Sequence, residues 1–152
     1  IWASDDMGFK TATLIAPDDL RAFVLPAHEK MAAMAHAAGR PYLLHSCGNL
    51  EEIMEDLIEV VQIDGKHSFE DIIMDVRDFS GKYGDRIAVL GGVDMDLLCR
   101  GSEEAIRQRV RSVLETCLAA GPYCLGTGNS VANYIPLENY LVMLDEGARF
   151  RV

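Results

Sequence analysis

The chain has 152 residues, 49% of them hydrophobic and 25% charged, which is the composition of an ordinary soluble globular protein. This length suffices for one domain with a substantial core, so we expect residues 1–152 to form part of a single domain. The net charge of −10 argues against a nucleic-acid partner and against an anionic membrane surface, since clustered Lys and Arg bind both. No apolar run approaches the roughly 20 residues that span a bilayer. The four cysteines lack the spacing of a disulfide scaffold, as expected of a cytoplasmic protein.

Short apolar runs alternate with helical patterns along the chain, which is the signature of parallel βα units. Residues 1–3 read as the middle of a buried strand, so we expect the chain to begin inside an element. The pattern predicts strands over residues 1–4, 41–45, 61–66, 87–90 and 122–125. Helices are expected from Pro17, over 27–38, after caps at Asn49 and at Ser68 with Asp71, from Ser102 to Gly121, and from Pro136. In the helix over 27–38, Met31 and Met34 are expected in the core.

Two architectures fit five strands with intervening helices. One is a doubly wound open sheet, complete in itself, and the other is part of an eight-stranded barrel. The pattern Gly-x-Gly-x-x-Gly is missing after the first strand, which argues against a dinucleotide-binding sheet. Both architectures place their sites at the carboxyl edge of the strands, where the polar and glycine-rich clusters of this chain occur.

The best chemical lead is His45 and Cys47, two residues apart at the end of the second strand. Side chains at i and i+2 of a strand point to the same face, so both can reach one metal ion. Imidazole and thiolate are zinc ligands, and a third protein ligand with one open position would make the site catalytic. His67, Cys124 and Asn129 are the candidates for that ligand. In the alternative interpretation His45 donates a hydrogen bond at the sheet edge and Cys47 simply packs.

Two other strand ends carry ionisable side chains. Asp5 and Asp6 could act as a general acid or base, or could cap the following turn. His67, preceded by Lys66, could bind an anionic substrate or be a polar residue at the rim. We therefore expect Asp5, Asp6 and His67 to be candidates for a catalytic role.

The last two strand ends offer candidates for substrate binding. Asp94 comes shortly after a pair of glycines. Like Asp5 and Asp6, it could act on the substrate or could cap the following turn. The glycine-framed loop after the fifth strand supplies donors for a carboxylate or phosphate from Thr127, Asn129 and Ser130, although such turns also occur without a ligand.

Four segments carry a family resemblance, in order and over essentially the whole chain: Asp5-Asp6-Met7-Gly8, Leu44-His45-Ser46-Cys47-Gly48-Asn49, Gly91-Gly92-Val93-Asp94 and Pro136-Leu137-Glu138-Asn139. Their succession resembles the uroporphyrinogen decarboxylase superfamily, which includes that decarboxylase and the corrinoid-dependent methyltransferases. Its members are (β/α)8 barrels of about twice this length or more. The resemblance thus implies an α/β fold, a partial TIM barrel of about five βα units from the C-terminal part. Such a fragment cannot close its barrel and is expected to be inactive alone.

The two branches of the superfamily differ in the site that they require. By resemblance, the methyltransferases use a His-x-Cys pair plus a later cysteine in the loop before the Pro-Leu-Glu-Asn segment. His45 and Cys47 match the pair, but Asn129 stands at the later position, so the third ligand departs from the pattern. The decarboxylases carry Gly-His-Gly in that loop, where this chain has Gly126-Thr127-Gly128.

The resemblance therefore favours a zinc-dependent methyltransferase that moves a methyl group between a corrinoid and a thiol or similar acceptor. His45 and Cys47 would hold the zinc. The implied partners are a small-molecule substrate and a corrinoid, free or on a partner protein, and exposed barrel edges would promote a homo-oligomer. The alternatives are a uroporphyrinogen decarboxylase of porphyrin biosynthesis and a non-catalytic relative that binds a corrinoid or another small molecule.

Overall fold

The structure is a computed structural model and describes residues 1–151. Within them, five parallel strands form one sheet in the order β1-β2-β3-β4-β5. The strands are β1 (Trp2–Ser4), β2 (Leu43–His45), β3 (Gly65–His67), β4 (Ala88–Leu90) and β5 (Tyr123–Cys124). A doubly wound sheet reverses its strand order at a switch point, whereas successive barrel units add each strand beside the last. The order confirms the predicted α/β fold and is that of a partial (β/α)8 barrel.

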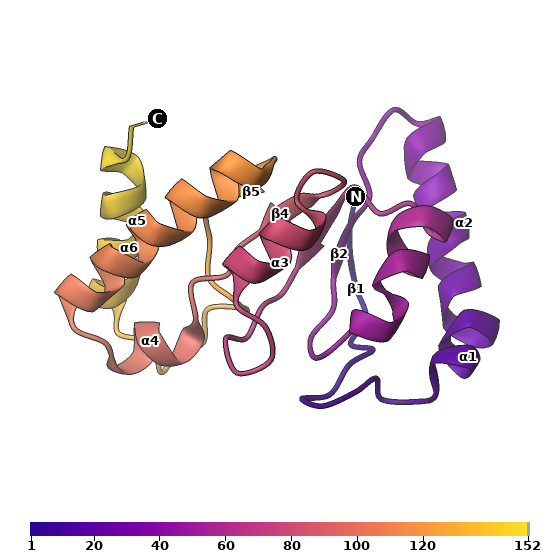
Figure 1. The fold of residues 1–152 in the computed structure, drawn as a ribbon, viewed down its shortest axis with the longest axis horizontal. Coiled ribbons are helices and arrows are strands. Elements are labelled where there is room, and N and C mark those ends of the chain that lie inside the picture. The colour runs from indigo at the N-terminus through magenta and orange to yellow at the C-terminus, as the bar shows by residue number, and fades with distance from the viewer. Residues whose placement is uncertain (152) are drawn as a thin grey trace.

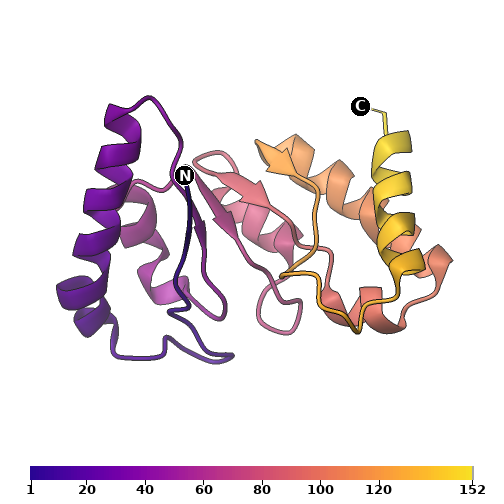
Figure 2. The same cartoon turned by 180° about the vertical axis from the view of Figure 1, so that it is seen from behind.

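The connections between the strands are helical. The first holds α1 (Pro17–Asp19), the π-helical η1 (Leu20–Val24) and α2 (Leu25–Ala37); the second holds the 3₁₀ turn η2 (Glu51–Ile53) and η3 (Asp56–Val60). The third holds α3 (Val76–Tyr83), the fourth holds α4 (Met95–Arg100) and α5 (Glu103–Ala120), and α6 (Leu137–Arg149) follows β5. Figure 1 shows η2, η3, α3 and α5 in front of the sheet, and Figure 2 shows the strands from behind, where the described part of the chain leaves their other face uncovered. A barrel has this arrangement, with helices outside and the inner face of the strands turned to its axis.

Alternation along the strands sorts side chains between the two faces. Leu44, Lys66 and Val89 lie in one register row and are buried beneath the helices. One residue further on, His45 pairs with His67 in the adjacent row. Because successive strand residues point to opposite faces, both histidines project from the face that Figure 2 shows open.

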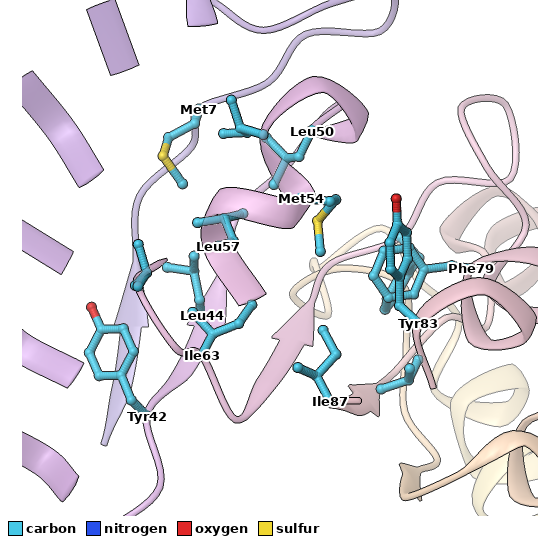
Figure 3. Close-up of a cluster of buried hydrophobic side chains, with 14 of the residues drawn as sticks. Met7, Tyr42, Leu44, Leu50, Met54, Leu57, Ile63, Phe79, Tyr83 and Ile87 are labelled. Atoms are coloured by element: carbon cyan, nitrogen blue, oxygen red, sulfur yellow. The ribbon is translucent and has the colours of Figure 1, made fainter. Parts of the chain in front are cut away.

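The main core lies between the sheet and the helices that cover it, and Figure 3 shows the part of it around the helical segment that follows β2. This segment turns an apolar stripe to the sheet, since Leu50, Ile53, Met54 and Leu57 are all buried. Burying such a side chain stabilises the fold by about 1.5–3 kcal/mol. The stripe therefore fixes the segment, and with it the loop that carries Cys47.

One predicted helix start is wrong. The cap expected at Ser68 with Asp71 is absent from the described structure, and α3 begins at Val76. Asp75 caps it, accepting a hydrogen bond from the Arg77 amide, while Asp71 pairs with Arg109 on α5. Residues 68–75 form a loop that reaches the carboxyl edge of the sheet.

Two smaller predictions also differ from the structure. The third strand was expected over 61–66, but β3 begins at Gly65, because η3 ends only at Val60 and the buried Val61 and Ile63 lie in the turn that follows it. Met31 and Met34 were expected in the core and are 42% and 74% exposed, since α2 buries its other side, including Ala32 and Ala35.

Across residues 1–151, no helix has both the length and the apolar character needed to cross a bilayer.

Candidate metal site at the carboxyl ends of β1 and β2

Three potential ligand atoms meet where β1 and β2 end, contributed by Asp6, His45 and Cys47, and all lie within 4.8 Å of one another. His45 Nε2 is 3.3 Å from Cys47 Sγ and 3.8 Å from Asp6 Oδ1. His45 is nearly covered, with 12% of its side chain exposed, whereas Asp6 is 57% exposed. The cluster thus joins a fixed imidazole to a carboxylate that faces solvent.

Two glycines let the loops after β1 and β2 approach this closely. Gly48 has a positive φ of 85°, and a Cβ there would stand 2.1 Å from the carbonyl carbon of Gly8. The Gly8 amide donates to the Cys47 carbonyl at 3.1 Å, and the Cys47 amide donates to Asp6 Oδ1 at 2.9 Å. The two segments of the family resemblance that follow β1 and β2 are therefore in direct contact, and that contact brings Asp6 to Cys47.

The Cys47 sulfur has polar neighbours on two further loops. Ser68 Oγ donates to it at 3.4 Å and Asn129 Nδ2 at 3.3 Å. Burial raises the pKa of the Cys47 thiol, and the Asp6 carboxylate raises it too, against the two hydrogen bonds that lower it. Without a cation the thiol form is favoured, whereas a bound metal ion would deprotonate it. The hydrogen bond that the Cys47 backbone amide donates to Asp6 lowers the pKa of this carboxyl group, which keeps it ionised.

The three donors fit a divalent metal such as zinc. Tetrahedral zinc with bonds of about 2.0–2.3 Å separates neighbouring nitrogen, oxygen and sulfur ligands by about 3.3–3.8 Å. The two donor separations given above match this spacing, and imidazole, thiolate and carboxylate are each ligands of this ion. A fourth position would remain for water or substrate, which is the arrangement of a catalytic site.

His67 and Cys124, two candidates for the third ligand, lie outside this cluster. His67 Nδ1 is 2.7 Å from His45 Nδ1, on the side of that ring away from Cys47, and its Nε2 is 3.1 Å from the Thr127 carbonyl. Cys124 is in β5, three strands from β2 and hence about 14 Å away. Asn129, the third candidate, does reach the Cys47 sulfur, as the resemblance implies for that loop position.

The two adjacent aspartates separate. Asp5 turns to the buried His28 on α2, with its Oδ2 3.2 Å from His28 Nε2, while Asp6 joins the cluster. His28 also forms a hydrogen bond through its Nδ1 with the Tyr42 hydroxyl, at 2.8 Å. The contacts of Asp5 are those of a structural residue, and its catalytic role stays a prediction.

A groove of about 820 Å3 runs along the same edge, within the range of about 300–1,000 Å3 that ligand pockets occupy. It lies between the loops after β3 and β5 and the start of α4. Three of the predicted substrate-binding residues line it, namely Asp94, Asn129 and Ser130. Asn129 connects the groove to Cys47, so a molecule in the groove would lie beside the cluster.

Asp94 and Thr127 also have structural roles. Asp94 caps α4 by accepting from the amides of Asp96 and Leu97, and it accepts from the Asp71 amide at 3.1 Å. Thr127 is 9% exposed, and its hydroxyl donates to the Asn129 carbonyl within the loop. Their part in substrate binding stays a prediction.

Two residues close to the cluster were expected from sequence to have other roles, Lys66 that of binding an anionic substrate together with His67. Ser68 was taken for a helix cap, yet its hydroxyl bonds to Cys47. Lys66 is buried on the helix side of the sheet, where its Nζ donates to the Ser68 carbonyl at 2.6 Å and stands 4.3 Å from the centre of the Phe69 ring. Strand alternation places a lysine between Gly65 and His67 beneath the helices, which is the signal that could have identified it.

Parallel βα units wound in one direction, with polar clusters at the carboxyl edge, define a protein of the (β/α)-barrel class. The family model described as uroporphyrinogen decarboxylase (URO-D) matches residues 3–150. The chain therefore belongs to the URO-D family, as the sequence resemblance predicted.

Two relatives add to this assignment. The chain is 29% identical over 130 residues to a methylated-thiol–coenzyme M methyltransferase of Methanosarcina mazei, an alignment that covers 85% of this chain and 32% of that protein. It also resembles the solved structure of a methyltransferase from Methanosarcina mazei, with a TM-score of 0.73, 23% identity, and coverage of 95% of this chain and 40% of that one. The structural likeness supports the fold. The chain spans about a third of the curated relative's length.

Proposed function

We propose that the protein is a zinc-dependent methyltransferase that moves a methyl group between a corrinoid and a thiol or similar acceptor. The observation that carries the proposal is the cluster of Asp6, His45 and Cys47 at the carboxyl edge of the sheet. Similarity to a methylated-thiol–coenzyme M methyltransferase supports both the reaction class and a thiol as acceptor.

Each residue of the site has a part in this proposal. Asp6, His45 and Cys47 would hold the zinc, which as a Lewis acid keeps an acceptor thiol deprotonated near neutral pH. Asn129 would orient Cys47 through its amide, in the place where the resemblance implies a third cysteine. The groove lined by Asp94 and Ser130 would hold the rest of the acceptor, and the open edge above it would admit a corrinoid, free or on a partner protein.

The metal content of the purified whole protein, not of residues 1–152 alone, tests this function directly. We expect about one zinc ion per chain in the wild type, and transfer of a methyl group from methylcobalamin to coenzyme M. Cys47→Ala should lose both the zinc and the methyl-transfer activity. Cys124→Ala is the matched control, because it removes an exposed thiol three strands away and should retain both. Protein without zinc that releases CO₂ from uroporphyrinogen would instead be the decarboxylase. Corrinoid binding without turnover would indicate a non-catalytic relative.

A further inference from the structure

A continuous line of hydrogen bonds runs from the candidate metal cluster to the loop after β5 through two imidazole rings. His45 Nδ1 lies 2.7 Å from His67 Nδ1, and His67 Nε2 lies 3.1 Å from the Thr127 carbonyl oxygen. The ring centres of the two histidines are 4.8 Å apart. Their strand register explains the contact, since His45 and His67 stand opposite each other at the ends of β2 and β3.

The direction of these hydrogen bonds follows from the carbonyl at the end of the line. A carbonyl oxygen can only accept, so His67 Nε2 carries the proton that it donates to Thr127. In the neutral ring Nδ1 is then an acceptor, and the proton between the two histidines belongs to His45 Nδ1. That leaves the lone pair of His45 on Nε2, the atom 3.3 Å from Cys47 Sγ and 3.8 Å from Asp6 Oδ1.

The loops around His67 hold its ring against the Thr127 carbonyl. The loop after β4 fits closely against the ring, because a Cβ on Gly91 would stand 2.8 Å from His67 Cδ2 and 2.3 Å from the Thr127 carbonyl oxygen. Gly91 thus makes room for the imidazole and its acceptor together.

We propose that His67 is a positioning residue, which fixes the tautomer and orientation of His45 so that His45 Nε2 faces the metal-binding cluster, and that His67 is itself neither a ligand nor a proton donor to substrate. Metal-bound histidines in proteins usually donate their other N–H to a carboxylate, a backbone carbonyl or water, and loss of that acceptor typically costs about 10–100-fold in metal affinity or activity. Here Nδ1 of His67 takes the place of that acceptor. The inference rests on the proposed zinc site, and it replaces the catalytic or ligand role expected of His67 from sequence.

Three variants of the whole protein test this role. His67→Leu removes the acceptor at similar volume, whereas His67→Asn retains an acceptor oxygen near the position of the ring Nδ1. We expect His67→Leu to weaken zinc binding about 10–100-fold in competition with a chelator, and His67→Asn to recover most of that loss. His36→Leu, which removes an imidazole paired with Asp64 away from the cluster, should leave the zinc affinity unchanged.

Imidazole ¹⁵N NMR of the metal-free protein provides a readout that general destabilisation would not move. We expect His45 in the Nδ1–H tautomer in the wild type and in His67→Asn, and a shift toward Nε2–H in His67→Leu. X-ray absorption of the zinc-loaded wild type should show one imidazole on the metal.

Each outcome separates this inference from the proposed function. A wild type that binds no zinc would refute the proposed function, while the tautomer of His45 would still test the role of His67. A wild type with two imidazoles on zinc would overturn the inference and leave the function standing. So would a His67→Leu variant with wild-type zinc affinity and an unchanged His45 tautomer.

Discussion

Asn129 is the residue at which the site departs most clearly from the methyltransferase pattern. Its Nδ2 lies 3.3 Å from Cys47 Sγ, so the loop after β5 already brings a side chain to the cluster. We expect Asn129→Cys to add a second thiolate and to strengthen zinc binding about tenfold or more. Chelator competition measures the change. Ser130→Cys is the matched control, and equal affinities in the two variants would show that position 129 is not directed at the metal.

Lys66 gives the fold an unusual pH dependence. Burial lowers its pKa from an ordinary value near 10.5 to about 7, against the raising effect of Cys47. Between these two values the unfolded chain binds the proton and the folded chain does not. The contribution of Lys66 to the unfolding free energy therefore increases with pH over this window, by up to about 1.4 kcal/mol per unit.

We expect Lys66→Met to remove this increase and to be more stable than the wild type near pH 7, because a buried ammonium is replaced by an apolar side chain. Denaturant unfolding at pH 7, 8 and 9 measures the effect. Lys30→Met, at an exposed position of α2, should follow the wild-type curve. If the unfolding free energies of wild type and Lys66→Met changed equally with pH, the lowered pKa of Lys66 would be contradicted.

At the scale of elements, the contact between the loops after β1 and β2 assembles the cluster. We expect Gly48→Ala to separate them, because a Cβ at this positive φ would overlap Gly8. Zinc affinity should fall at least about tenfold, and the unfolding free energy by about 1–3 kcal/mol. Isothermal titration and chemical denaturation report the two effects.

Gly81→Ala is the control for that substitution. Gly81 lies within α3 with open space around its Cα, so alanine there should raise the helix stability by up to about 1 kcal/mol and leave zinc binding intact. Retention of full zinc affinity in Gly48→Ala would mean that the loops do not need this close approach.

Contacts between elements also explain which parts of the fold and of the site could be predicted from the sequence and which could not. Alternation and strand ends sufficed to place His45 and Cys47 on one face, because an i, i+2 relation is local. The contacts of Asp6 and Ser68 with Cys47 depend on the register between strands, which no local pattern specifies. The start of α3 was misplaced for a related reason. Both Ser68 and Asp75 are good caps, and the choice of Asp75 depends on its ion pair with the distant Arg109.

At the scale of the whole molecule, the five βα units form an incomplete circle. In the described residues β1 and β5 each have one strand neighbour, and the inner face of the sheet is open (Figure 2). α6 carries a second uncovered surface, since Leu137, Leu141 and Leu144 share one face of the helix at 63%, 52% and 43% exposure. In a closed barrel neighbouring units would cover such surfaces.

A polypeptide of residues 1–152 alone is therefore expected to self-associate. Exposed apolar stripes and open strand edges promote contacts between copies, and association would bury both. Light scattering after size exclusion should give a mass above the 16.8 kDa of one chain. Leu141→Glu with Leu144→Glu should shift the distribution toward the monomer, because two charges would interrupt the α6 stripe. Phe23→Glu, which removes an isolated ring that is 77% exposed on η1, should not. A monomeric wild-type polypeptide, or an equal shift with Phe23→Glu, would show that these surfaces are not what drives association.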